Sequence, residues 1–401
     1  MAFLSTTTRV LALFLLLLAV AVPGAPARAA APQDFAFVYL YQEDDPAYAE
    51  QRAYTGLKLR ERKRPLAGAE TALKDARILG RALGLRFTLE SVALPAAAAP
   101  AAFLRDLVAR GGSRTFLLDL PLAQLRGLAA ELAGDDVILF NIRHGAAELR
   151  QEACAATLFH TLPSLAMRSD ALAQFLAARG WRRVLVLQGE AEADKAFADA
   201  FQASARKFGL TVAAVRPFVL SNDPRQREQN NIALLTAEPA YDVVFLADDV
   251  GEFGRYVPYA TYLPRPIVGS EGLVASAWHW TWERHGAPQL NQRFDRLAGR
   301  LMADEDWAAW AALRVVVEAI ARAGTTETAQ LRATLTAADF TFDLYKGFPG
   351  SFRPWDHQLR QPVLLHTHNA VIASAPLPGF LHQRNELDSL GTDLSESRCR
   401  F

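Results

Sequence analysis

Charged side chains gather at a few points along this 401-residue sequence, and each group suggests a particular chemistry. Arg143 could bind a carboxylate through two parallel hydrogen bonds. The alternative is that Arg143 pairs with a nearby acid such as Glu148. Asp248 and Asp249, followed by Glu252, supply the oxygen ligands that hard cations prefer. Acids in such a position more often cap the following helix or contact a ligand amine, so we expect no metal here.

Other residue groups do not fit a metal or catalytic site. His279, Glu283 and His285 lie close together, but a zinc-binding helix needs histidines four residues apart. We expect a structural aromatic segment there, in which Trp278 could also form an aromatic wall for a flat ligand. Motifs of serine hydrolases, zinc proteases and P-loop proteins are absent from the sequence. We therefore expect a protein that is not an enzyme and has no cofactor.

Alternating strand and helix patterns must position these groups. Short β-rich runs are predicted at 35–41, 86–94, 115–120 and 136–143, then at 183–187, 211–219, 241–247 and 266–269. Helical patterns are predicted in the second half of 46–83 and at 101–109, 121–133, 169–178 and 192–208. Parallel strands need such crossover helices. The sequence thus predicts an α/β protein with two lobes, each a mainly parallel sheet flanked by helices.

The remaining third of the sequence has a different pattern. Helical spacing returns at 290–324, where one face carries Trp307, Trp310, Leu313, Val317 and Ile320. Two short runs near the C-terminus, 362–365 and 370–374, predict an antiparallel hairpin.

The N-terminus predicts export. Arg9, the uncharged apolar run 10–22 and the small residues around Arg28 are typical of a cleaved secretory signal, residues 1–29. The alternative is a retained anchor, but the apolar run is shorter than the roughly 20 residues that span a bilayer. The mature chain then has 41 basic and 43 acidic residues, a net charge of −2, which excludes a polybasic nucleic-acid binder. In the oxidising compartment that such an exported chain reaches, Cys154 and Cys399 are expected to form a disulfide.

Several longer strings resemble a known family. LFHTLPSLA (158–166) and GWRRV (180–184) are similar to the interlobe segment of type I periplasmic binding proteins, the ABC-transporter receptors best known for branched-chain amino acids. His160 stands where that family has Arg, which leaves any role of the Arg in doubt. Four strings resemble the subfamily associated with PQQ-dependent alcohol dehydrogenase systems: NQRFDRLAGRLM, DWAAWAALRVVVEAI, SFRPWDHQLRQP and GFLHQRNELDSLG.

The resemblance implies two lobes joined by three hinge strands, with a ligand bound between them. We expect residues 30–147 and 272–345 in lobe one, and residues 148–271 and 346–401 in lobe two with its C-terminal tail. Ligands of open α/β sheets bind beyond the carboxyl ends of the strands. The candidate ligand-binding residues are therefore Tyr41, Gln42, Leu122, Asn141, Arg143, His144, Gln188, Glu190, Asp248, Asp249, Glu271 and Trp278.

The ligand is not expected to be an ordinary amino acid. Amino-acid receptors of this family hold the α-carboxylate with hydroxyls and backbone amides after their third and fourth strands. The matching segments here are 120–123 and 141–144, and Pro121 has no amide hydrogen. Arg143 instead suggests an organic acid or PQQ, and the sequence does not distinguish these from an aromatic compound or a metal chelate.

Two functions follow from the resemblance. The first is a monomeric periplasmic substrate-binding protein that delivers a small molecule to an ABC permease and is linked to PQQ-dependent alcohol oxidation. The alternative is an exported accessory protein that acts on a PQQ-dependent alcohol dehydrogenase by protein contact. Neither function involves nucleic acid.

Overall fold

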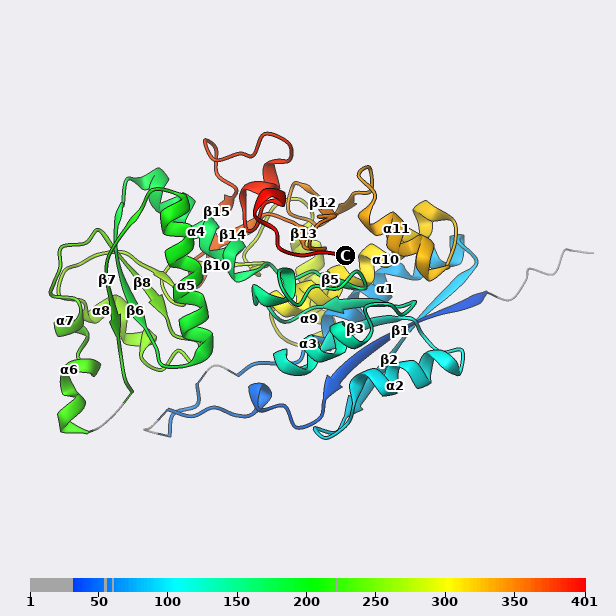
Figure 1. The fold of residues 1–401 in the computed structure, drawn as a ribbon, viewed down its shortest axis with the longest axis horizontal. Coiled ribbons are helices and arrows are strands. Elements are labelled where there is room, and N and C mark those ends of the chain that lie inside the picture. The colour runs from blue at the N-terminus through cyan, green and yellow to red at the C-terminus, as the bar shows by residue number, and fades with distance from the viewer. Residues whose placement is uncertain (1–31, 54–55, 60, 221–222) are drawn as a thin grey trace, which may run out of the picture.

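The computed structural model describes residues 32–53, 56–59, 61–220 and 223–401. The expected signal segment, residues 1–29, lies outside the described residues. Two lobes lie side by side, each built on a parallel sheet flanked by helices (Figure 1). The predicted fold class is confirmed. Within the described part of the chain, no helix is long and apolar enough to cross a membrane.

Lobe one is built on a five-stranded parallel sheet with the order β2-β1-β3-β4-β5. Its strands are β1 (Gln33–Gln42), β2 (Leu85–Leu94), β3 (Thr115–Asp119), β4 (Ile138–Asn141) and β5 (Leu158–His160). The crossovers contain α1 (Leu66–Ala82), α2 (Pro100–Ala109) and α3 (Leu122–Glu131). All residues of β3 and β4 are buried, because helices cover both faces of the sheet.

Lobe two is built on a four-stranded parallel sheet with the order β7-β6-β8-β9. Its strands are β6 (Arg183–Gln188), β7 (Thr211–Pro217), β8 (Val243–Ala247) and β9 (Ile267–Gly269). One face packs against α4 (Leu165–Arg179) and α5 (Glu192–Lys207). The other face packs against shorter elements that include α7 (Ile232–Leu235) and α8 (Val257–Ala260), and α6 (Arg227–Asn230) precedes α7.

The chain then returns to lobe one through α9 (Ala287–Ala298), α10 (Asp304–Ala323) and α11 (Thr328–Thr336). The predicted apolar face of α10 is buried in the core of lobe one. Helices α1 and α10 approach so closely that a Cβ atom on Gly68 would lie 1.9 Å from the backbone oxygen of Asp306. The single helix predicted at 290–324 is two helices, because Gly299 ends α9 in a left-handed conformation.

Two small antiparallel sheets lie where the chain passes between the lobes. One contains β10 (Val274–Ser276), β14 (Val363–His366) and β15 (Val371–Ala375), and it confirms the predicted hairpin. The other contains β11 (Phe342–Asp343), β12 (Pro349–Phe352) and β13 (Leu359–Arg360).

The chain changes lobe after β5, after β10, and between β13 and β14. The lobe boundaries expected at 147, 271 and 345 stay predictions. Among the short strands near these crossings, β10 pairs with β14, which is far away in the sequence, so no local pattern predicts β10.

Single turns of 3-10 helix are η1 (Pro46–Tyr48), η2 (Glu148–Arg150), η3 (Pro224–Gln226), η4 (Gly254–Tyr256), η5 (Glu386–Ser389) and η6 (Leu394–Glu396). The last two lie in the C-terminal segment, which ends beside lobe one. There Cys399 forms the predicted disulfide with Cys154, a pairing that is confirmed.

Candidate functional site

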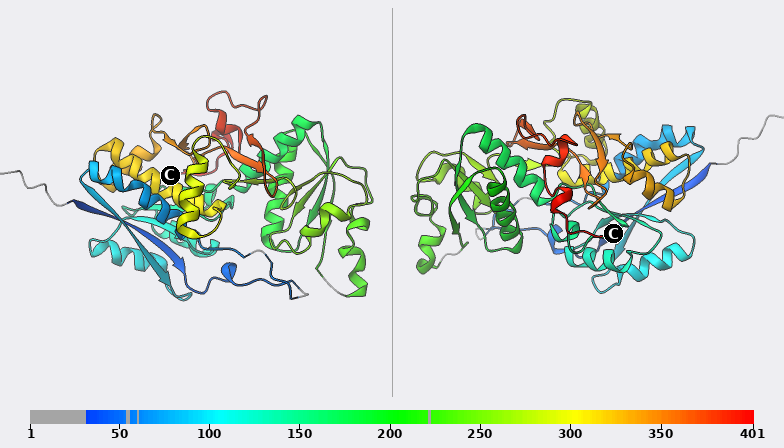
Figure 2. Two further views of the ribbon diagram at one scale, coloured as in Figure 1. Left: turned by 180° about the vertical axis from the view of Figure 1, so that it is seen from behind. Right: turned by 45° about the horizontal axis from the view of Figure 1, so that its top comes forward.

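The predicted ligand-binding residues lie mainly at the carboxyl ends of the two parallel sheets. The loop between β1 and α1 extends from lobe one to lobe two, and we call residues 43–65 the β1–α1 loop, of which 54, 55 and 60 are outside the described residues (Figure 2). Arg62 in this loop pairs with Asp249, which follows β8, at 2.5 Å. Both side chains are almost half exposed. The loop thus joins the lobes across the edges where the site was predicted.

A hollow of about 260 Å³ lies between this loop and lobe two. It is lined by Lys58, Leu59, Asp248, Asp249, Val250, Gly251, Arg255, Ser270 and Glu271. The structure therefore brings together the three acids that were predicted after β8 and β9. They face the basic part of the β1–α1 loop, which sequence reasoning did not place there.

The two adjacent aspartates after β8 have different roles. Asp248 accepts hydrogen bonds from the backbone N–H groups of Gly251 at 3.0 Å and Gly254 at 2.6 Å. Burial raises the pKa of the Asp248 carboxyl, although these N–H donors oppose the shift. The backbone N–H of Asp249 donates to the carboxylate of Asp194 at 2.6 Å, and the carboxylate of Asp249 accepts a hydrogen bond from Arg62. Asp248 therefore shapes the hollow, while Asp249 holds a charged partner, Arg62, in an exposed pair.

Asp119, the last residue of β3, is the centre of a polar network in lobe one. Its buried carboxylate accepts hydrogen bonds from the hydroxyls of Tyr39 and Tyr48, both at 2.6 Å. Arg64 from the β1–α1 loop donates to it at 3.0 Å. The Arg64 guanidinium also lies 4.4 Å from the ring centre of Tyr41 and 4.3 Å from that of Tyr48. Burial raises the pKa of the Tyr48 hydroxyl, and the charge of Asp119 adds to the shift.

Arg143 belongs to the same network. It pairs with Asp45 at 2.5 Å and with Asp119 at 3.3 Å, and its side chain is only 12% exposed. Arg143 is thus paired with acids, as the alternative interpretation predicted. The partner is not Glu148, because Glu148 pairs with Arg126 at 3.3 Å. In this network, which forms a wall of the cleft side of lobe one, the charges of two arginines and two aspartates neutralise one another: Arg64, Arg143, Asp45 and Asp119. Arg143 is therefore not free to bind an anionic ligand without giving up an existing partner.

Asn141 and His144 tie together the ends of neighbouring strands. The fully buried Asn141 donates to the carbonyl oxygen of His144 at 2.7 Å and contacts Nδ1 of His160 at 3.0 Å. Nε2 of His144 lies 2.7 Å from the carbonyl oxygen of Leu120, so this nitrogen carries a proton. Burial lowers the pKa of His144 to about 4, which leaves the ring neutral near pH 7. Both predicted residues therefore maintain the strand ends.

The other predicted residues differ in exposure. Gln42 is buried and accepts a hydrogen bond from Gln124 at 2.6 Å, and Leu122 begins α3. Gln188 ends β6 partly buried, and Glu190 is exposed just beyond it. Trp278 is 2% exposed, donates to Asn291 at 2.9 Å and stacks on Trp307. Its placement in the core of lobe one does not support a role as an aromatic wall of the cleft.

Several residues of the site were not predicted from the sequence. Asp119 had a visible signal, because it is an acid at the end of a buried strand that is mostly apolar. Arg62 and Arg64 lie in a basic run that has no local sign of its partners. Glu305, near the start of α10, is partly buried. Burial and the charge of Asp304 raise its pKa, against the opposing charges of Arg168 and Arg62.

Glu305 therefore lies within the electrostatic reach of both the β1–α1 loop and α4 of lobe two. Arg168 of α4 also pairs with Asp304 at 2.8 Å, which links lobe two to α10 directly. In the described part of the chain, no group of three or more histidine, cysteine or acidic residues is arranged to hold a metal ion.

Comparisons with known proteins give the fold of this chain. No protein-family model matches the sequence, and no curated protein does. A branched-chain amino acid ABC transporter periplasmic ligand-binding protein from Burkholderia xenovorans is 14% identical, with a TM-score of 0.69 over 91% of this chain and 99% of that chain. A leucine-, isoleucine-, valine-, threonine- and alanine-binding protein from Brucella ovis is 15% identical, with a TM-score of 0.64 over 85% and 92%.

A third structure is a solute-binding protein of an ABC transporter from R. palustris in complex with benzoate. It is 13% identical, with a TM-score of 0.63 over 92% of this chain and 100% of that chain. At these identities the likeness concerns the fold. The chain has the two-lobed fold of type I periplasmic binding proteins.

Proposed function

We propose that the protein is the periplasmic substrate-binding component of an ABC transporter and captures a small molecule between its lobes. The observation that carries this proposal is the hollow of about 260 Å³ between the β1–α1 loop and the carboxyl ends of β8 and β9. A ligand there can contact both lobes. Such contact is required, because a ligand favours the closed state only by its higher affinity for that state.

The charges around the site favour a ligand with a cationic or neutral polar group. Arg64 and Arg143 already have carboxylate partners, and Pro121 cannot donate a backbone hydrogen bond after β3. In lobe two the carboxylate of Asp249 already holds a guanidinium, that of Arg62, in an exposed and exchangeable pair. A ligand amine or guanidinium would replace Arg62 at Asp249. This changes the expectation of an organic acid or PQQ that Arg143 had suggested.

The link to PQQ-dependent alcohol oxidation is a further part of the proposal. It rests on the four strings that resemble the associated subfamily, and an ABC permease and a PQQ-dependent alcohol dehydrogenase are the partners it implies. The neutralised wall around Asp119 also suits the second candidate function, an exported accessory protein that contacts such a dehydrogenase and transports no ligand.

Native mass spectrometry of freshly purified protein, followed by a thermal-shift screen, tests the proposal. The probes are putrescine, agmatine, succinate, benzoate and PQQ, each far above an expected micromolar dissociation constant. A specific ligand at 100 times its dissociation constant stabilises the folded state by about 2.7 kcal/mol. We expect stabilisation by a cationic probe, and Asp249→Asn should remove it while Arg126→Gln leaves it intact. An empty cleft with no responding probe, together with capture of the dehydrogenase, would favour the accessory protein.

A further inference from the structure

The C-terminal segment lies against both lobes at the side of the hinge opposite the β1–α1 loop. Figure 1 shows it between the lobes, next to β14 and β15, and Figure 2 shows the same position in two further views. We consider residues 387–401 and call them the brace. Their contacts alternate between the two lobes.

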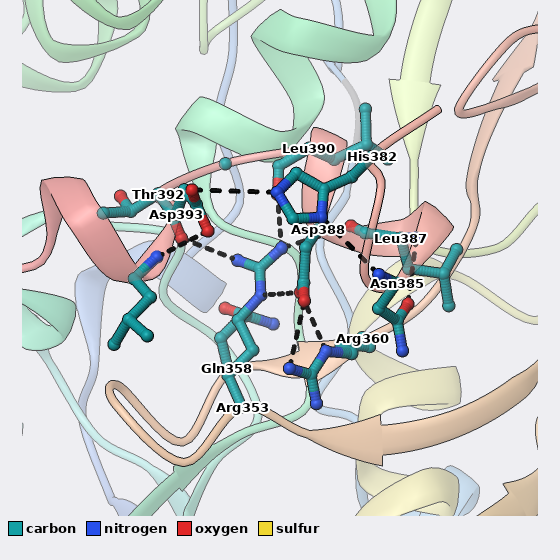
Figure 3. A network of polar contacts seen from close by, with 12 residues as sticks. Arg353, Gln358, Arg360, His382, Asn385, Leu387, Asp388, Leu390, Thr392 and Asp393 are labelled. Carbon is teal, nitrogen blue, oxygen red and sulfur yellow. Dashed lines mark hydrogen bonds and ion pairs between the residues drawn. The ribbon is translucent and has the colours of Figure 1, made fainter. Parts of the chain in front are cut away.

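The brace first binds lobe one through a buried ion pair. Arg353, which follows β12, donates from Nε to Asp388 at 2.9 Å, and Arg360 on β13 donates to the same carboxylate at 2.8 and 3.0 Å (Figure 3). Arg353 is 1% exposed and Asp388 is 4% exposed. Arg353 also donates to the carbonyl oxygens of Leu387 at 3.2 Å and Leu390 at 2.6 Å. One guanidinium thus holds both the side chain and the backbone of the brace.

The residues immediately after Asp388 bind lobe two. Leu390 is part of the core between α4 and the sheet of lobe two. The backbone N–H of Gly391 donates to Asp170 of α4 at 2.7 Å, and its carbonyl oxygen accepts from Lys207 of α5 at 2.9 Å. A Cβ atom on Gly391 would lie 2.7 Å from Cγ of Met167, so the brace is packed directly onto α4.

The end of the brace returns to lobe one. Gln151, in the loop between β4 and β5, donates to the hydroxyl of Thr392 at 3.1 Å and accepts from the backbone of Arg398 at 2.8 Å. Cys399 is joined to Cys154 of the same loop by the disulfide. The brace is therefore anchored to lobe one, then to lobe two, then covalently to lobe one.

We propose that the brace is a fourth connection between the lobes, which limits how far they open. When lobes rotate apart on the ligand side, the back of the hinge must rearrange, and that is where the brace is packed. The buried cluster of Arg353, Arg360 and Asp388 resists this rearrangement, because pulling the Asp388 carboxylate away from both arginines would leave buried charges unpaired. The disulfide keeps the end of the brace attached to lobe one even when the polar contacts are broken. The limit that the brace sets on opening does not depend on the identity of the ligand.

Single-molecule FRET between the lobes tests the proposal. Noncanonical amino acids at Ile78 and Tyr259, which are 74% and 91% exposed, carry the dyes and leave the cysteines unaltered. One released form combines Cys154→Ser with Cys399→Ser, and a second adds Asp388→Asn. We expect the interlobe distance distribution to widen in the first form and more in the second.

A matched control and a folding check make the result decisive. Arg398→Gln removes an exposed pair between Arg398 and Glu152 but keeps the disulfide, so its distance distribution should match that of the wild type. Circular dichroism identifies the folded forms, and if the form with Asp388→Asn does not fold, the cysteine variant decides alone. Folded released forms with the wild-type distribution, or equal widening in Arg398→Gln, would overturn the proposal.

Discussion

Replacing Arg143 with alanine tests whether this arginine stabilises lobe one or binds a ligand. The substitution removes the guanidinium that lies 2.5 Å from the carboxylate of Asp45, a side chain that is only 2% exposed. Breaking a buried pair by removing one partner costs about 3–5 kcal/mol. Asp119 keeps Arg64 and two tyrosine hydroxyls, and Asp45 keeps the N–H of Ala47. We therefore expect a loss of about 2–3 kcal/mol in the free energy of unfolding, at or below the lower end of that range.

Urea denaturation at pH 7 measures this loss, with Arg126→Ala as the control. The pair between Arg126 and Glu148 is exposed, so the control should lose at most about 1 kcal/mol. Burial opposes ionisation of Asp45, but the hydrogen bond from Arg143 lowers its pKa below the ordinary value. A lowered pKa stabilises the fold above the unfolded value of about 4, and this contribution disappears as the pH falls through the folded pKa.

The difference between wild type and Arg143→Ala should therefore shrink below about pH 4. The reasoning would be refuted if Arg143→Ala were as stable as the Arg126→Ala control. Unchanged stability with loss of affinity for an anionic probe in calorimetry would place Arg143 in the ligand site instead.

Three further predictions concern single positions. Gly68→Ala should lower the free energy of unfolding by about 2 kcal/mol or more, because its Cβ meets the backbone of α10, whereas Gly127→Ala in α3 meets no atom within 4 Å and should stabilise by about 0.5–1 kcal/mol. Urea midpoints that move in the same direction would contradict this pair. Burial lowers the pKa of His144 to about 4, so the unfolded chain binds the extra proton below about pH 6.5 and stability falls with acidification. Between pH 7.5 and 5 the free energy of unfolding of His144→Gln should therefore fall by about 2 kcal/mol less than that of the wild type. An unaltered dependence of stability on pH would disprove this prediction. Arg62→Gln and Asp249→Asn should each cost less than about 1 kcal/mol, with a coupling energy in a double-mutant cycle that 0.5 M salt weakens; strictly additive effects would show that the pair does not form in solution.

Local sequence patterns were sufficient for the regular parts of the fold. The alternation of β-rich runs with helices predicted both parallel sheets, since parallel neighbours require a crossover. The spacing of apolar residues predicted the buried face of α10. The pairing of Cys154 with Cys399 followed from there being two cysteines in a chain that was expected to be exported. These features depend on composition or on neighbours within a few residues.

The site depended on contacts that no local pattern contains. Asp45 and Arg143 are 98 residues apart, and Arg62 and Asp249 are 187 residues apart. The charge of Arg143 was visible in the sequence, but whether that charge was free or already neutralised depended on where the β1–α1 loop folds. The brace was hidden for the same reason, because its contacts are with Arg353, Asp170 and Gln151, which are distant in the sequence. Residue types and spacing thus determined the sheets and the cysteine bridge, while the tertiary structure decided which charges are paired.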